Sequence, residues 1–457
     1  MRVVILGAGV SGHTAALLLR KQLSREHEVA VVTPNSKWNW IPSNIGVGTG
    51  TMTPELHPEG DASHPRPYIV AESTGTDTRG QRVELDYDYL INATGPRLNF
   101  GATPGLGPDG HSVSVCTYQH AAHASQTLDA LVAEMKQGAK KTLVVGTGHG
   151  TCEGAAFEYI FNLEFELRKR GVRDQARLVF LTNEAGLGDF GVGGLHLKMG
   201  GYVTPSKVFT ESLFVERGVE WSTGAHVARV EPKKVFYETL DGEHHELDFD
   251  FAMLLPPFTG VPLTAFDAAG ADVTRELFSP NGFMRVDADY RPKDPSEWKA
   301  ADWPERYQTP KYKNVFAIGI AFAPPHAISL PRKTKNGTVI APAPPRTGMP
   351  SAIMGRAVAH SIVDMINGAP DATRGASMAR LGAACVASAG ASWFKGSAAS
   401  MTMCPIVPDF EKYPDSGRDL SHTSGEIGLA GHWIKQALHH AFLYKAKALP
   451  LWWIIPE

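Results

Sequence analysis

The stretch RVVILGAGVSGHTAALLL, residues 2–19, decides the fold of this chain. Its apolar run VVIL is typical of a buried parallel strand, and the residues after Gly12 have the pattern of a helix. Gly7, Gly9 and Gly12 follow the G-x-G-x-x-G spacing: the first allows a tight turn, the second admits a pyrophosphate, and the third lets helix and strand pack closely. A helix N-terminus also offers free N–H groups to an anion. We therefore predict a dinucleotide here, the alternative being a glycine-rich turn without a ligand.

Length and composition limit the class of protein. A chain of 457 residues is expected to form two or three domains, and a net charge of -3 gives no reason to expect nucleic acid. No apolar run is long enough for a transmembrane helix, and because the chain starts almost directly on a strand, no signal peptide is expected. Four cysteines are too few for a disulfide scaffold: Cys116, Cys152, Cys385 and Cys404.

A second strand–glycine–helix unit occurs at residues 141–169. Gly146, Gly148 and Gly150 follow its strand, although the third glycine is displaced from the ideal spacing. The unit therefore predicts a second Rossmann-like domain, which either binds a nicotinamide nucleotide or retains the fold without that site. The buried strand predicted at residues 314–322 returns the chain to the first domain.

The C-terminus differs in kind from the rest of the chain. In residues 433–444 apolar side chains fall on one helical face, whereas Lys435, Gln436, His439 and His440 fall on the other, which we expect to be solvated. Basic residues and a Trp-rich end follow. This composition suits a membrane interface, and the alternative is a helix docked on the protein or on a partner subunit.

Several motifs, taken together and in order, resemble one family. They are ILGAGVSG at 5–12, PSN at 42–44, INATG at 91–95, SVCTYQH at 114–120, TCEGAAFE at 151–158, AIGIAFAPP at 317–325, PRTGMPS at 345–351 and AACVASAG at 383–390. The chain thus resembles the sulfide:quinone oxidoreductases, within the flavoproteins that have two dinucleotide-binding domains, over nearly its whole length.

The resemblance implies an α/β fold with two Rossmann-like domains and a C-terminal membrane-interface region. Residues 1–115 and 310–375 would form the FAD-binding domain, residues 116–309 the second Rossmann-like domain, and residues 376–457 the region that completes the active site and anchors the protein. It also implies FAD as the cofactor, held by Gly7, Gly9, Gly12, Asn44, Thr94, Gly95, Gly319 and Arg346. Thr33 and Asn35 stand at the end of the second strand, where such units often have an acidic residue, and either could form a hydrogen bond with a ribose hydroxyl.

The resemblance further implies the catalytic residues. Cys152 and Cys385 would be the redox pair, Cys116 a third cysteine, His120 and His196 histidines near the active site or the quinone side, and Glu158 a carboxylate for proton handling. Sulfide attack on a disulfide gives a persulfide and frees a thiolate, which must lie against the flavin to pass on two electrons. Because Cys152 precedes the second helix of this type, we expect the helix dipole to lower its pKa. A lone buried cysteine is more often an inert apolar residue, and that alternative applies to Cys116 and Cys404.

The expected activity is therefore oxidation of sulfide to polysulfide or sulfur, with electrons passed to a membrane quinone. The expected location is the surface of the plasma or inner membrane, reached through residues 432–457, and a homo-oligomer is expected. Three alternatives remain: a sulfide dehydrogenase that donates to a cytochrome, an NADH:quinone oxidoreductase, and a non-catalytic FAD-binding protein. The last is kept open because residues 52–67 are too short and too rich in proline for the helix and strand that the family has there.

Overall fold

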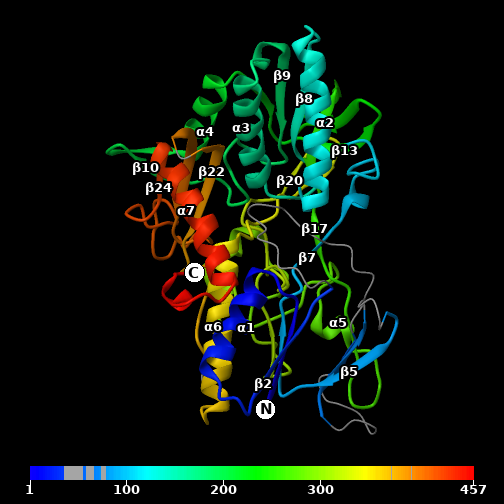
Figure 1. The fold of residues 1–457 in the computed structure, drawn as a ribbon, viewed down its shortest axis with the longest axis vertical. Helices are drawn as coiled ribbons and strands as arrows, with labels where there is room; N and C mark the ends of the chain where they lie inside the picture. The colour runs from blue at the N-terminus through cyan, green and yellow to red at the C-terminus, as the bar shows by residue number, and fades with distance from the viewer. Residues whose placement is uncertain (35–54, 58–65, 74–78, 372, 393) are drawn as a thin grey trace.

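The computed structural model describes residues 1–34, 55–57, 66–73, 79–371, 373–392 and 394–457 (Figure 1). The predicted Asn44 and most of the proline-rich segment lie outside these ranges. Within the described residues the chain forms a mixed α/β structure with two separate parallel sheets, and the predicted fold class is confirmed.

The first parallel sheet has the strand order β19-β6-β1-β2. Its strands are β1 (Arg2–Leu6), β2 (Glu28–Val32), β6 (Tyr89–Asn92) and β19 (Val315–Ala317), so a strand from late in the chain completes it, as predicted. Helix α1 (Val10–Gln22) follows β1 and lies beside α6 (Gly348–Ile366) in Figure 1. The apolar run of β1 is fully buried because it occupies a central position in the sheet.

The second parallel sheet has the order β12-β9-β8-β16. Its strands are β8 (Lys141–Thr147), β9 (Ala176–Leu181), β12 (Val219–Ser222) and β16 (Phe251–Leu255). Helices α2 (Tyr118–Lys136) and α3 (Gly154–Lys169) pack on it in the upper half of Figure 1. Phe157, Ile160 and Phe161 of α3 are buried, which confirms the apolar face predicted for this helix.

A third sheet belongs to the C-terminal part of the chain and has the order β11-β10-β24-β23-β22. Its strands are β10 (His196–Met199), β11 (Tyr202–Pro205), β22 (Ala383–Ser392), β23 (Lys395–Met403) and β24 (Ser424–Gly428). Helix α7 (Leu429–Ala446) packs against β22 and β23. The small residues of β22 also allow close contact with α3, so this sheet joins the second Rossmann-like unit to the C-terminus.

The remaining strands form small sheets at the edges of the molecule. They are β3 (Glu55–His57), β4 (Tyr68–Glu72), β5 (Arg82–Asp86), β7 (Pro96–Leu98), β13 (His226–Glu231), β14 (Lys234–Glu238), β15 (His244–Asp248), β17 (Phe258–Gly260), β18 (Thr264–Ala265), β20 (Arg332–Lys333) and β21 (Val339–Ile340). Two short helices, α4 (Ser206–Glu216) and α5 (Thr274–Leu277), complete the described α-helices. The short strand β3 was not expected from its sequence. The proposed domain boundaries stay a prediction.

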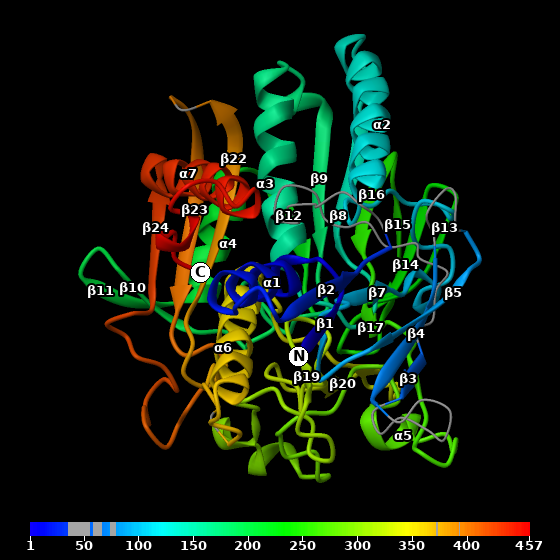
Figure 2. The same ribbon diagram turned by 60° about the horizontal axis from the view of Figure 1, so that its bottom comes forward.

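The end of the chain returns to the first helix. His13 Nε2 of α1 lies 2.9 Å from the carbonyl oxygen of Ala446, and Lys21 Nζ lies 3.9 Å from the ring centre of Trp453. Figure 2 shows the C-terminus beside α1. Among the residues described, none of the helices has the length and apolar character needed to cross a bilayer.

Candidate active site

A cavity of about 1040 Å³ lies where the first parallel sheet, α3, β22 and α7 meet. It is lined by residues from segments that are far apart in the sequence. They include Gly7, Gly9, Thr33, Thr94, Gly95, Cys116, Cys152, Glu158, Arg346, Thr347, Cys385, Lys435 and His439. The fold therefore gathers ten of the predicted site residues at one place, and their roles stay predictions.

The glycine-rich turn forms one end of this cavity. Gly7 has a φ of +99°, and a Cβ atom there would lie 2.3 Å from the carbonyl oxygen of Ala93, so a side chain is excluded by both conformation and space. A Cβ on Gly9 would meet nothing within 4 Å, so the Cα of Gly9 borders open space in the cavity at the start of α1. This is the arrangement that admits a pyrophosphate to a helix N-terminus.

Two further predicted glycines do not line the cavity but permit the packing that shapes it. A Cβ on Gly12 would lie 2.2 Å from the carbonyl oxygen of Gly7, and a Cβ on Gly319 would lie 2.6 Å from Ser11 Oγ. Both positions keep α1 close to its neighbours. Their contribution to a cofactor site is therefore indirect.

Arg346 is the buried cation of this cavity. Its guanidinium donates to the carbonyl oxygens of Ile320 and Phe322 and lies 4.7 Å from the ring centres of Phe283 and Phe322. Burial lowers the pKa of Arg346 to about 9. Within the described part of the chain, its Nε and the hydroxyl of Thr347 are buried and have no hydrogen-bond partner. A buried donor without a partner destabilises the folded protein, so these two donors on the cavity wall fit a ligand whose polar ring atoms accept hydrogen bonds from them.

Three cysteines reach the cavity from different elements. Cys152 lies just before α3, Cys385 lies on β22, and Cys116 lies just before α2. All of them are thiols, and Cys152 Sγ lies 3.4 Å from the carbonyl oxygen of Phe190, to which it donates. Cys404 is also a thiol, but it does not line the cavity.

The expected lowering of the Cys152 pKa is wrong. Burial raises it well above the ordinary value, the N–H of Gly154 lowers it in part, and charge on Glu184 adds to the increase. Burial likewise raises the pKa of Cys385 and of Cys116 to about 11. The N-terminus of α3 does favour a thiolate, but desolvation of a thiolate at this depth is the larger effect.

Glu158 forms an ion pair that the sequence did not indicate. Its Oε2 lies 3.1 Å from Lys435 Nζ, which also donates to the carbonyl oxygen of Val386 at 3.3 Å, next to Cys385. Burial raises the pKa of Glu158, and the neighbouring ammonium of Lys435 opposes that increase. Helix α7 turns this part of its polar face toward the cavity, so His439 lines the cavity and is half-buried, whereas His440 is exposed as expected.

The two other predicted histidines do not line this cavity. His120 lies on α2 with its ring centre 5.9 Å from that of Phe100. His196 is exposed at the start of β10 and lines a different cavity. We therefore do not carry either residue into the proposed mechanism.

Comparisons with known proteins agree with this architecture. A family model described as "Pyridine nucleotide-disulphide oxidoreductase" matches residues 1–172. The sulfide-quinone reductase of Aquifex aeolicus is 30% identical over 97% of this chain and 91% of that protein. The chain belongs to the sulfide:quinone oxidoreductase family. The solved structure of the Aquifex aeolicus sulfide:quinone oxidoreductase has a TM-score of 0.71, covering 98% of this chain and 91% of that chain. A mitochondrial sulfide:quinone oxidoreductase of Dictyostelium discoideum is 24% identical over 70% of this chain and 64% of that protein.

As a member of this family of oxidoreductases, the chain is an enzyme and its cofactor is FAD. The cavity fits that cofactor in two respects. The open space beside Gly9 can receive a pyrophosphate, and the unpaired Nε of Arg346 and hydroxyl of Thr347, which belong to the lining of the same cavity, would give hydrogen-bond partners to polar atoms of the cofactor. The predicted Thr33, Thr94 and Gly95 also line it.

Proposed function

We propose that this sulfide:quinone oxidoreductase family member oxidises sulfide through Cys152 and Cys385 and transfers the electrons to a quinone. One observation carries the proposal. The two cysteines are more than two hundred residues apart, yet both line the cavity that begins at the dinucleotide-binding turn. That placement serves a reaction in which sulfur chemistry and a two-electron cofactor must share one space.

The sulfur step is exchange at a disulfide between Cys152 and Cys385. Hydrosulfide attacks one sulfur, a new S–S bond forms, the old S–S bond breaks, and the products are a persulfide on one cysteine and a thiolate on the other. FAD, when bound in this cavity, supplies the two-electron acceptor. For the chain to grow, the persulfide and the thiolate must lose two electrons, which FAD would accept, and re-form a bridge that is longer by one sulfur atom. Each further hydrosulfide requires the same two-electron oxidation, and the product is a polysulfide. Cys116 lies within the same cavity and can hold a sulfur product.

Glu158 supplies protons for quinone reduction in this proposal, since reduction of a quinone to a quinol takes up two protons. The carboxyl lies at the cavity wall beneath α7, and its raised pKa keeps it protonated to a higher pH than an exposed glutamate. The ammonium of Lys435 limits that shift. The pair therefore sets the pH range in which the carboxyl can donate.

The quinone reaches this site from a membrane, on which the protein docks through an apolar C-terminal surface. We use that name for Trp433, Ile434, Leu438, Leu451, Trp453 and Ile454, whose exposed fractions run from 39% for Leu438 to 68% for Ile454. Six large apolar side chains in one short segment are typical of a membrane interface. Docking on the plasma or inner membrane and formation of a homo-oligomer stay predictions.

The NADH:quinone alternative is disfavoured by the second Rossmann-like unit. The carboxylate just after its second strand is where many such units bind the nucleotide ribose. Here that residue is Glu184, which is fully buried and accepts hydrogen bonds from the N–H of Gly191 and the hydroxyl of Ser329. Its carboxylate is therefore already committed to the protein's own backbone and side chains.

The test uses purified holoenzyme under anaerobic conditions. Addition of sulfide is expected to bleach the flavin absorbance, and a soluble quinone is expected to restore it. Cys152→Ser and Cys385→Ser should each abolish the bleaching, whereas Cys404→Ser, which alters a thiol outside the cavity, should not. Bleaching by NADH and not by sulfide, or full activity in both variants, would overturn the proposal.

A further inference from the structure

A glycine-rich segment, residues 186–194, separates the active-site cavity from a second cavity of about 640 Å³. Phe190 faces the first cavity, while Val192 and Gly193 line the second. Phe190 itself has a φ of 50°, which is uncommon for a residue with a large side chain. Something other than local preference must therefore hold this segment in place.

Two buried glutamates hold it. Glu153 Oε1 accepts hydrogen bonds from the N–H of Gly188 at 2.9 Å and of Phe190 at 3.2 Å. Glu184 Oε1 accepts from the N–H of Gly191 at 2.5 Å. Phe190 and Gly191 are neighbours in the chain, and the N–H of the first binds Glu153 while the N–H of the second binds Glu184. The two carboxyl groups therefore lie close together. Neither side chain is exposed.

This pair connects the thiol of Cys152 with the second cavity. Cys152 precedes Glu153 in the chain, and its thiol donates to the carbonyl oxygen of Phe190, the residue whose N–H binds Glu153. On the other side, the hydroxyl of Ser329 donates to Glu184 Oε2 at 2.9 Å, and Ser329 lines the second cavity. The carboxyl pair therefore lies between the thiol of Cys152 and the second cavity.

We propose that Glu153, paired with Glu184, is an internal proton acceptor for Cys152. When Cys152 ionises, the S–H bond breaks and the proton passes to the Glu153 carboxylate, so a thiol and a carboxylate become a thiolate and a carboxylic acid. One negative charge is present before and after. Ionising the thiol without this transfer would place two negative charges in a desolvated site, which is more costly. Both glutamates are thus positioning residues for the proposed sulfur chemistry.

The titration behaviour supports this geometry. Burial raises the pKa of Glu153 to about 7, while hydrogen bonds from the N–H groups of Phe190 and Gly188 oppose the shift. Burial, followed by the charge of Glu153, raises the pKa of Glu184 well above its ordinary range. Burial and mutual repulsion therefore make the two carboxyl groups hold a proton to a higher pH than two exposed glutamates would.

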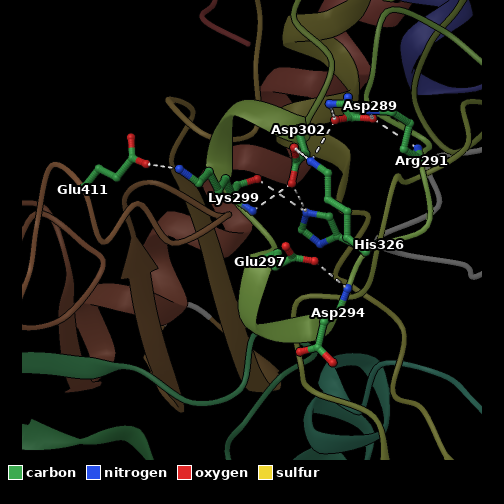
Figure 3. A network of polar contacts seen from close by, with 9 residues as sticks. Asp289, Arg291, Asp294, Glu297, Lys299, Asp302, His326 and Glu411 are labelled. Carbon is green, nitrogen blue, oxygen red and sulfur yellow. Dashed lines mark hydrogen bonds and ion pairs between the residues drawn. The ribbon is translucent and has the colours of Figure 1, made fainter.

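Other charged groups surround the Glu153–Glu184 pair on two sides, toward the second cavity and toward the thiol of Cys152. Asp189 lies in the same segment, and its pKa is raised by burial and lowered by Arg332 and Lys207. Cys385, Glu158 and Lys435 face the thiol side. The wall of the second cavity also carries the network of Figure 3, in which His326 Nε2 lies 3.5 Å from Asp302 Oδ2 and Lys299 Nζ lies 2.7 Å from Glu411 Oε1.

The test measures ionisation of Cys152 directly. Holoenzyme reduced with dithiothreitol is alkylated with iodoacetamide from about pH 5 to about pH 9, and modification of the peptide that contains Cys152 is followed by mass spectrometry. In the wild type the rate should rise tenfold per pH unit up to about pH 7 and then flatten, because further ionisation would require a second negative charge. In Glu153→Gln the rate should continue to rise tenfold per pH unit through pH 9, since no internal acceptor remains.

Three comparisons complete the design. Glu153→Asp should restore the flattening, Glu184→Gln should retain it, and Glu164→Gln, which alters another buried glutamate of α3, should match the wild type. A wild-type rate that rises steadily to pH 9 would refute the proposal without any variant. Loss of the flattening in Glu184→Gln would overturn the assignment of the acceptor to Glu153. Because alkylation requires no turnover, failure of sulfide to bleach the flavin would reject the proposed function alone.

Discussion

Replacing Lys435 with methionine tests the proton-donating role of Glu158. The substitution keeps most of the length of the side chain but removes the ammonium 3.1 Å from Glu158 Oε2. Burial already raises the pKa of Glu158, and Lys435 is the group that opposes the shift most strongly. Without that cation the carboxyl should remain protonated to a still higher pH.

The size of the shift follows from the lost interaction. A hydrogen bond that involves charged groups contributes about 1.5–3 kcal/mol, and one pKa unit corresponds to about 1.4 kcal/mol. The pKa of Glu158 should therefore rise by about one to two units. A carboxyl that donates a proton loses activity as the pH rises through its pKa, so the alkaline limb of the pH profile should move to higher pH by that amount.

The assay isolates the quinone step. Holoenzyme is reduced with dithionite in the absence of sulfide, and reoxidation by a soluble quinone is followed by stopped-flow absorbance across a range of pH. Omitting sulfide matters because Lys435 also lowers the pKa of Cys385. Lys435→Arg retains the positive charge and should leave the limb where it is in the wild type. An alkaline limb that stays in place or moves to lower pH in Lys435→Met would refute the assignment.

Two further predictions concern the cofactor and the membrane. Gly9→Ala should leave the thermal stability of the apoprotein unchanged but reduce the FAD content of the purified enzyme, because the added Cβ meets no protein atom and would occupy cofactor space. Gly7→Ala should instead lower the free energy of unfolding, measured by denaturant titration, by about 2 kcal/mol or more, because the added Cβ meets the backbone of Ala93. Trp453→Glu combined with Ile454→Glu should weaken binding to phospholipid vesicles at least about tenfold in sedimentation assays, since each side chain contributes on the order of 1–3 kcal/mol when buried. Val215→Glu, which alters an equally exposed residue of α4, is the matched control. Equal binding of both variants would reject the apolar C-terminal surface as the docking site.

Much of the fold could be predicted because short sequence patterns, such as an apolar run followed by spaced glycines, specify the local backbone structure by themselves. The apolar run before Gly7 and the glycine spacing after it specify a strand, a turn and a helix, whatever the rest of the chain does. The second such unit at Gly146 and the late strand that returns to the first sheet were predicted on the same grounds. Helix α1 begins at Val10, earlier than expected, because Gly9 already takes the N-cap position.

The orientation of the C-terminal helix α7 could not be predicted from its sequence pattern. Its alternation of apolar and polar residues was visible, but the pattern does not say which face meets the protein. The structure turns Lys435 and His439 toward the cavity, together with the apolar Leu438 and Phe442, and leaves Trp433 and Ile434 exposed. The ion pair of Lys435 with Glu158 is one contact that favours this orientation, and the helix pattern by itself does not contain it.

The sequence by itself determined that a dinucleotide binds after the first strand and that its four cysteines do not build a disulfide scaffold. The tertiary structure decided which of those cysteines line the active-site cavity, since Cys385 joins Cys152 and Cys116 there only when β22 packs against α3. It also decided their chemistry. A helix N-terminus favours a thiolate at Cys152, yet burial and the nearby carboxyl groups raise its pKa, because desolvation depends on atoms that the chain brings in from elsewhere.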